Sequence, residues 1–372
     1  MPLPALRHLT WSKVEAPHHH LNLAESAIAT PDLEAMGLPH RGALPVTGYR
    51  LLETLERSLG ERIGAPGGQV LVTAGGSEAN ACVFGALLEP GQEVLVEIPG
   101  YEPHREVPGI FGLLARGFAR PFEAGGRGLA DAVEAALSPA TRMVVISHLH
   151  NPSGLALAEG EAAALDRLAA SRGLWLLCDE IFRDATRAPL GTFASLSPRW
   201  ISTGSLTKIY GLGGLRIGWI AGSPEVRARC AALQNALSVL PALPSVSLAL
   251  ELWLHLDTLR ARAHRILAEN HARWAEFSGN GAAIRCPAQS LGTTAWCQFA
   301  GPSEGDAFSD FASRRFDLAV APGRFFGEPA GFRVALGVEP APFRAALEVL
   351  NQAAQEFGAA TVDSRHAVAE RP

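Results

Sequence analysis

Strand-like and helix-like segments alternate from about residue 50 to residue 275, and this alternation constrains the fold more than any other feature. Five short runs are rich in β-branched and apolar residues, namely QVLVTA, EVLVEIP, RMVVISHL, LWLLCD and WISTGS. Helical stretches such as SEANACVFGALL and EGEAAALDRLAAS lie between them. Because these strands are apolar on both faces, we expect a mostly parallel sheet that helices cover on both sides.

The pattern changes after about residue 280, where TTAWCQFA and FDLAVAPG predict strands and APFRAALEVLNQAAQEF predicts a helix. We therefore expect an α/β fold with two domains. The larger would be a three-layer α/β/α domain over residues 45–275 with a mostly parallel sheet. The smaller would be an α+β domain made from residues 1–44 and 276–372.

Composition and charge narrow the class of protein. The chain is 48% apolar and 19% charged, which is typical of a globular protein. Its net charge is -5 and its basic residues are scattered, so no nucleic-acid partner is expected. The five cysteines are widely spaced without a CxxC pair, which predicts reduced thiols and no metal site. With no signal core and no membrane-length apolar run, we expect a cytoplasmic protein with no membrane partner.

Residues that follow the strands are the candidate site, because ligands bind beyond the carboxyl ends of strands in open α/β sheets. The turn AGGSEAN could hold a phosphate at the start of a helix near Ser77, although plain helix capping explains it equally well. Asp179 ends a buried strand, where a carboxylate needs a partner. That partner could be an ion pair, a helix cap or a protonated ring nitrogen.

The segment STGSLTKIYGLGGLRIGW follows the next strand and contains Ser205, Lys208 and Arg216. A lysine in an apolar, glycine-rich site is desolvated, which lowers its pKa and frees the amine as a nucleophile. Arg216 could bind a phosphate through two parallel hydrogen bonds. The run GLGGLRIG does not match GxGxxG and lacks the opening βαβ context of a dinucleotide site.

Two more strand ends carry Asn151, in HLHNPSG, and Tyr101, in IPGYEPH. Taken singly, the first indicates a turn and the second a packed aromatic. In combination and in this order, however, the motifs resemble the class I/II aminotransferases of pyridoxal-phosphate (PLP) fold type I, the aspartate aminotransferase-like enzymes. The run VAPGRFFG at 320–327, followed by Phe332 and Arg333, resembles the small-domain signature of that family. The resemblance covers nearly the whole chain.

The resemblance implies that PLP is the cofactor and that Lys208 carries it as a Schiff base, then moves the proton between the substrate Cα and the cofactor C4′. Asp179 would pair with the pyridine N–H, Asn151 would hydrogen-bond the 3-hydroxyl, and Tyr101 would stack on the ring. Arg333 would bind the substrate α-carboxylate. The phosphate would be held by Gly76, Ser77, Ser205 and Arg216. The resemblance also implies a homodimer with its active site at the subunit interface.

The chain departs from the family pattern in three places. Phe182 replaces the tyrosine that donates to the ring oxygen, so the pKa of the Schiff base is expected to differ. The family often has an N-terminal tyrosine that contacts the phosphate of the neighbouring subunit. The matching stretch here, RGALPVTGYR, has no tyrosine five residues before Gly48, and Tyr49 is offset, so we do not assign that role to Tyr49. The LGEP pattern reads LAES at Leu23–Ser26, beside the substrate in the family, so we expect an unusual substrate.

The leading hypothesis is an aminotransferase that moves an amino group from an amino acid to a 2-oxo acid. A second hypothesis, on the same fold, is a C–S β-lyase or a β/γ-replacement or cyclising enzyme. A third is a non-catalytic sensor, of the kind that some transcription regulators carry behind a winged-helix domain. The absence of a basic patch and the start of the cofactor motifs by residue 75 count against the sensor. We interpret His18, His19 and His20 as an exposed loop rather than a metal site. We interpret Glu180 as a structural carboxylate rather than a catalytic one.

Overall fold

A seven-stranded sheet lies at the centre of the computed structural model, which describes residues 6–41, 49–65, 69–122, 125–186, 191–279, 284–287, 289–299 and 304–369. The strand order is β2-β8-β7-β6-β5-β3-β4, and only the β8 pairings are antiparallel. The strands are β2 (Val70–Thr73), β3 (Glu93–Ile98), β4 (Leu114–Ala119), β5 (Thr141–Ser147), β6 (Trp175–Asp179), β7 (Trp200–Ser205) and β8 (Gly218–Ala221). The predicted mostly parallel sheet is confirmed.

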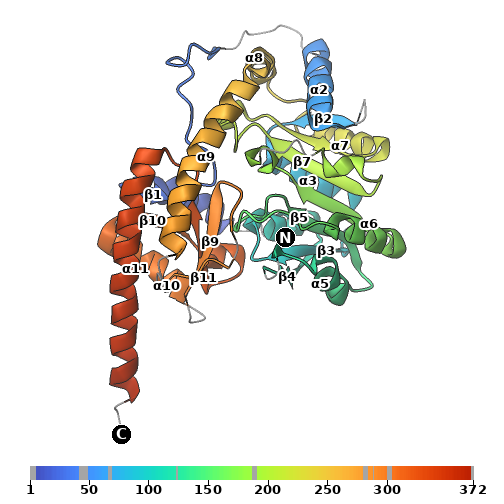
Figure 1. Ribbon diagram of the computed structural model, residues 1–372. Coiled ribbons are helices and arrows are strands. Elements are labelled where there is room, and N and C mark those ends of the chain that lie inside the picture. The colour runs from blue at the N-terminus through green and yellow to red at the C-terminus, as the bar shows by residue number, and fades with distance from the viewer. Residues whose placement is uncertain are drawn as a thin grey trace.

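Helices cover both faces of this sheet, as Figure 1 shows. Alternate residues of β5 point to opposite faces. Met143 and Val145 pack in one buried cluster with α3 (Gly76–Leu87) and α7 (Pro224–Leu237). Val144 and Ile146 pack in another cluster, with α5 (Leu129–Ala136) and α6 (Glu161–Arg172). The three-layer α/β/α arrangement that the sequence predicts is therefore confirmed.

Two strands of the large sheet were not predicted from the sequence. Only Phe118 of the edge strand β4 is buried, so that strand lacks an apolar pattern. β8 has four residues and begins at Gly218, inside the glycine-rich run that follows Lys208. Gly218 is required there because a Cβ would collide with the backbone of Gly75. Short or exposed strands of this kind take their structure from their neighbours in the sheet rather than from their own pattern.

A second sheet of four strands has the order β1-β10-β11-β9. Its first strand comes from the N-terminal segment and pairs in parallel with β10, and the other pairings are antiparallel. Helices α10 (Glu304–Phe316) and α11 (Pro340–Ala369) pack beside it (Figure 1). The strands are β1 (Leu21–Leu23), β9 (Thr294–Gln298), β10 (Leu318–Pro322) and β11 (Gly331–Ala335).

Helix α9 (Leu256–Gly279) runs between the two sheets (Figure 1) and crosses residue 275 without a break. The division of the chain into residues 45–275 and the remainder therefore stays a prediction. The other α-helices are α1 (Arg7–Val14), α2 (Tyr49–Ile63), α4 (Glu102–Glu106) and α8 (Leu243–Trp253). Short 3-10 helices are η1 (Ala16–His18), η2 (Val107–Phe111), η4 (Arg183–Ala185), η5 (Phe193–Ser195), η6 (Gly213–Leu215) and η7 (Gly323–Phe326).

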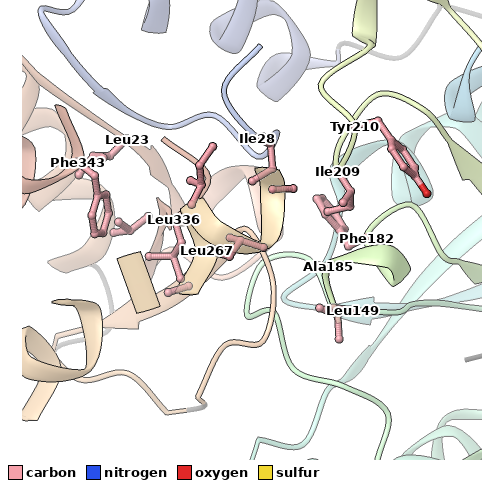
Figure 2. Close-up of a cluster of buried hydrophobic side chains, with 14 of the residues drawn as sticks. Leu23, Ile28, Leu149, Phe182, Ala185, Ile209, Tyr210, Leu267, Leu336 and Phe343 are labelled. Atoms are coloured by element: carbon pink, nitrogen blue, oxygen red, sulfur yellow. The ribbon is translucent and has the colours of Figure 1, made fainter. Parts of the chain in front are cut away.

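One buried apolar cluster joins the two sheets, and Figure 2 shows part of it. It contains Leu23 and Ile28 from the N-terminal segment, Leu267 from α9, and Phe182 and Ile209 from the ends of the large sheet. Burying these side chains is worth roughly 1.5–3 kcal/mol each, which fixes the N-terminal segment against the large sheet. Within the described residues, no helix is long and apolar enough to cross a bilayer.

Candidate active site

A cavity of about 600 Å³ lies beyond the carboxyl ends of β5, β6 and β7. This volume is within the range of small-molecule sites. The residues that line it are Leu9, Ser12, Glu25, Ser26, Gly76, Ser77, Asn80, Tyr101, His104, Ser147, Asn151, Asp179, Ile181, Phe182, Thr207, Lys208 and Arg216. Most of the residues predicted from strand ends therefore meet in one place.

The Lys208 side chain projects into this cavity from the turn after β7. Its Nζ donates a hydrogen bond to Ser26 Oγ at 2.8 Å, and its carbonyl accepts from the Ile28 N–H at 2.9 Å. Desolvation lowers the pKa of the Lys208 amine from 10.5 to about 8, with Glu25 opposing the shift and Arg333 adding to it. About a tenth of the amine is therefore uncharged and nucleophilic at pH 7, far more than for a solvated lysine.

Asp179 is held rigidly at the end of β6. Its Oδ2 accepts from Asn80 Nδ2 at 3.1 Å and lies 3.2 Å from His104 Nε2, while Oδ1 accepts from the Ile181 N–H at 3.1 Å. Because a carboxylate oxygen can only accept, His104 carries its proton on Nε2 in this contact. Asn80 is oriented in turn, since its Oδ1 accepts from Thr203 Oγ1 at 2.7 Å. The arrangement keeps one carboxylate directed into the cavity.

Asn80 and His104 were missed in the sequence analysis. His104 lies in α4, three residues after Tyr101, which is the N-cap of that helix. Their rings meet edge-on with centroids 5.2 Å apart. Asn80 lies four residues after Gly76 on α3, which places both on one face. This helical spacing is the signal that could have identified them.

Arg333 lies on β11 of the small sheet and is 1% exposed. Nη1 donates to Asn151 Oδ1 at 3.0 Å, and Nη2 donates to the Ala24 carbonyl at 2.6 Å. Its guanidinium stacks over the Phe326 ring at 5.0 Å, and burial lowers its pKa to about 10. Among the described residues, Nε has no hydrogen-bond partner. A buried N–H without a partner favours an anionic ligand beside it.

The part of the cavity beside the start of α3 carries Gly76 and Ser77, and Arg216 also lines the cavity. Gly75 has φ 89°, and a Cβ there would collide with the Arg216 guanidinium, so only glycine allows this close approach. The free N–H groups at the start of α3 add positive potential. The Tyr101 hydroxyl hydrogen-bonds Ser77, and burial raises the pKa of Tyr101. This part of the cavity suits an anion such as a phosphate.

Two predicted site residues lie behind the cavity wall. Arg333 reaches it through Asn151, as described above. Ser205 is 4% exposed, and its Oγ accepts from the Thr207 N–H at 3.2 Å, so that Thr207 lines the cavity instead.

Tyr49 begins α2, is 71% exposed and does not line the cavity. The stretch just before it, including Gly48, lies outside the described residues.

Phe182 lines the cavity and is also part of the buried cluster in Figure 2. It offers no hydroxyl, so this wall is apolar where the family has a donor. Glu180 points away from the site: its Oε1 accepts from the Phe193 N–H at 2.7 Å and from the Thr192 hydroxyl at 3.2 Å. Those bonds support the structural interpretation of Glu180.

A mostly parallel seven-stranded sheet, with an aspartate ending β6 and a lysine after β7, defines an aspartate aminotransferase-like fold of PLP fold type I. The model of the family "Aminotransferase class I and II" matches residues 31–350, and the chain belongs to this family.

Similar proteins include both transaminases and a synthase. A probable N-succinyldiaminopimelate aminotransferase of Mycobacterium tuberculosis is 35% identical over 219 residues, or 55% of each chain. The chain thus spans about half the length of this first curated relative. Capreomycidine synthase of Streptomyces vinaceus is 30% identical over 276 residues, covering 72% of this chain and 70% of the synthase.

Solved structures share the fold. A PLP-dependent aminotransferase from Streptococcus suis has a TM-score of 0.83 at 21% identity, covering 96% of this chain and 99% of that one. The PLP-dependent cyclase OrfR has a TM-score of 0.77 at 24% identity, covering 96% and 98%. Identities this low establish the fold alone, and the family assignment rests on the sequence match.

Proposed function

We propose that the protein is a PLP-dependent aminotransferase that moves an amino group from an amino acid to a 2-oxo acid. The observation that carries this proposal is the meeting of Lys208, Asp179, Asn151, Tyr101 and Arg216 around one cavity. A lysine whose pKa is lowered, a fixed carboxylate and a group of anion-binding residues at one site are the groups that PLP chemistry requires.

The residues present fit the cofactor. Arg216, whose guanidinium takes the space that the absence of a Cβ at Gly75 leaves, would hold its phosphate together with Gly76 and Ser77 at the start of α3. Ser205 would support this end through the turn that carries Thr207. Tyr101 would stack on the ring. These assignments follow from donor chemistry and cavity position together.

Asn151 and Asp179 would fix the orientation of the ring. Because Arg333 occupies Asn151 Oδ1, the Asn151 Nδ2 group is left to donate to the cofactor 3-hydroxyl oxygen. Asp179, already held by Asn80 and His104, would keep the pyridine nitrogen protonated. With no hydroxyl at Phe182, Asn151 would be the main donor to that oxygen, which supports our expectation of an altered pKa for the lysine–cofactor linkage.

When bound, PLP supplies an electron sink that stabilises a carbanion at the substrate Cα. Lys208 would hold the cofactor covalently and, once the substrate amine has replaced it, take the proton from Cα and return it at the cofactor C4′. Arg333 would bind the α-carboxylate through Nε, its free donor. Holding the carboxylate fixes the position of Cα relative to Lys208 Nζ and so lowers the entropic part of the barrier.

The same proposal covers assembly and location. We propose a homodimer with its site at the subunit interface, as the family resemblance implies, and two domains divided near residues 45 and 275. We also propose a cytoplasmic location, which is supported by five cysteines that form no disulfide.

A cyclising or replacement reaction is a second candidate, and a specific observation favours it. Ser26 replaces the proline of the LGEP pattern, and its hydroxyl lies 2.8 Å from Lys208 Nζ. A hydroxyl beside the reacting amine can relay a proton to a leaving group on the substrate side chain. Two of the similar proteins are named a synthase and a cyclase.

Absorbance spectroscopy of the purified holoenzyme tests the proposal. An amino acid should shift the visible cofactor band, and a 2-oxo acid should restore it. Lys208→Ala should abolish the native band and turnover, while Lys13→Arg, which alters the only other lysine, should keep both. Unchanged turnover in Lys208→Ala would refute the proposal. Conversion of the amino acid, with its amino group retained in the product and no need for a 2-oxo acid acceptor, would favour the second candidate.

A further inference from the structure

Glu25 lies between two residues that contact the reactive groups of the site. The carbonyl of Ala24 accepts from Arg333 Nη2, and the hydroxyl of Ser26 accepts from Lys208 Nζ. Ala24 and Ser26 are buried, whereas the Glu25 side chain is exposed to solvent and lines the cavity. The carboxylate therefore lies beside both the α-carboxylate site and the reacting amine.

Glu25 has no hydrogen-bond or ion-pair partner among the residues that the structure describes. The nearby cations are bonded elsewhere, since Lys208 donates to Ser26 and Arg333 donates to Asn151 and Ala24. The charge of Glu25 still reaches them, because it raises the pKa of both Lys208 and Arg333. It is thus an unpaired anion in the cavity.

The charges expected when cofactor and substrate are bound also point to Glu25. On the proposed function, Arg216 pairs with the phosphate, Arg333 with the α-carboxylate and Asp179 with the ring nitrogen, while Lys208 is tied to the cofactor as the substrate enters. Glu25 is then the one charged group among the described cavity residues without a counterion. A carboxylate left unpaired in the cavity wall favours a cationic ligand group and repels an anionic one.

We infer that Glu25 selects substrates, and that the protein acts on amino acids with a cationic side chain, a guanidinium or an ammonium group. This inference rests on the proposed function, since Arg333 and Lys208 define the end of the substrate that leaves the side chain facing Glu25.

The test compares L-arginine with L-citrulline, which has nearly the same shape without the charge, and with L-glutamate. Single-turnover conversion of the cofactor band and calorimetric Kd values are measured on the holoenzyme. We expect arginine to bind at least about 10-fold more tightly than citrulline, with glutamate weakest. Equal Kd values for arginine and citrulline, or a preference for glutamate, would overturn the inference.

Substitutions attribute the preference to Glu25. Glu25→Gln should remove the advantage of arginine over citrulline, and Glu25→Lys should improve the relative binding of glutamate. Glu15→Gln is the matched control, because Glu15 is also exposed but does not line the cavity, so it should leave the ratio unchanged. Equal losses for arginine and citrulline in Glu25→Gln would indicate a structural role and refute selection by charge.

The two proposals fail in different ways. If no amino acid changes the cofactor band, the proposed transamination is wrong, while the Kd ratio of arginine to citrulline still decides the role of Glu25. If the band responds equally to all three amino acids and the Kd values are equal, transamination stands and selection by Glu25 is wrong.

Discussion

The Lys208 amine should titrate more than two pH units below an ordinary lysine in the cofactor-free protein. Desolvation in the cavity lowers its pKa from 10.5 to about 8, a shift that Arg333 and Arg216 reinforce and that Glu25 and Asp179 oppose. At pH 7 this raises the uncharged fraction from about 0.03% to about 9%, roughly 300-fold. The sign follows from burial, because removing water penalises the ammonium form and leaves the amine largely unaffected.

Competitive labelling measures this pKa directly. Cofactor-free protein is treated with trace dinitrofluorobenzene between about pH 6 and pH 11, and the labelling of each lysine-containing peptide is read by mass spectrometry. The chain has only two lysines, Lys13 and Lys208, so the peptides are easily distinguished. Labelling of Lys208 should rise with a midpoint near pH 8, as its pKa of about 8 requires.

Two controls separate the effect of the cavity from general reactivity. Lys13→Arg should leave the Lys208 titration unchanged, which shows that the labelling assigned to Lys208 does not come from Lys13. Unfolding the protein in urea should return the Lys208 midpoint to about 10.4, because the amine is then solvated. A midpoint above about 9.5 in the folded protein would refute the argument that the cavity desolvates this amine.

Two further predictions concern the frame of the site. Arg120 Nη1 and Glu97 Oε2 lie 2.6 Å apart, and their side chains are 0% and 1% exposed. Arg120→Met would leave the Glu97 carboxylate buried without its partner, so it should lower the free energy of unfolding by about 3–5 kcal/mol in urea denaturation. A loss below about 1 kcal/mol would contradict a buried ion pair. Gly75→Ala should raise the Kd of PLP about 10-fold in an absorbance titration, because the new Cβ displaces Arg216. Gly91→Ala, with a similar φ of 87° but open space around its Cβ, is the control that should not affect cofactor binding.

The positions of Lys208, Asp179 and Asn151 could be predicted because they follow strands of a parallel sheet. Each strand carries its own signal, a short run of apolar residues, and parallel strands end at one edge of the sheet. The structure brings these residues around one cavity. Strands without such a signal were missed, as β4 and β8 show.

Contacts between distant segments could not be predicted in the same way. Asn80 and His104 meet Asp179 across 99 and 75 positions of sequence. The bond from Lys208 to Ser26 spans 182 positions. No local sequence pattern encodes these contacts, because they depend on how helices and loops pack after the sheet has formed.

The sequence by itself determined the fold class, the family resemblance and the residue that we propose carries the cofactor, because these depend on local runs and on motif order. Only the tertiary structure decided what surrounds that residue. It packs the N-terminal segment against α9 and the large sheet, through apolar side chains such as Ile28 and Leu267. That packing sets Glu25 in the wall of the cavity, where its charge can act on a substrate.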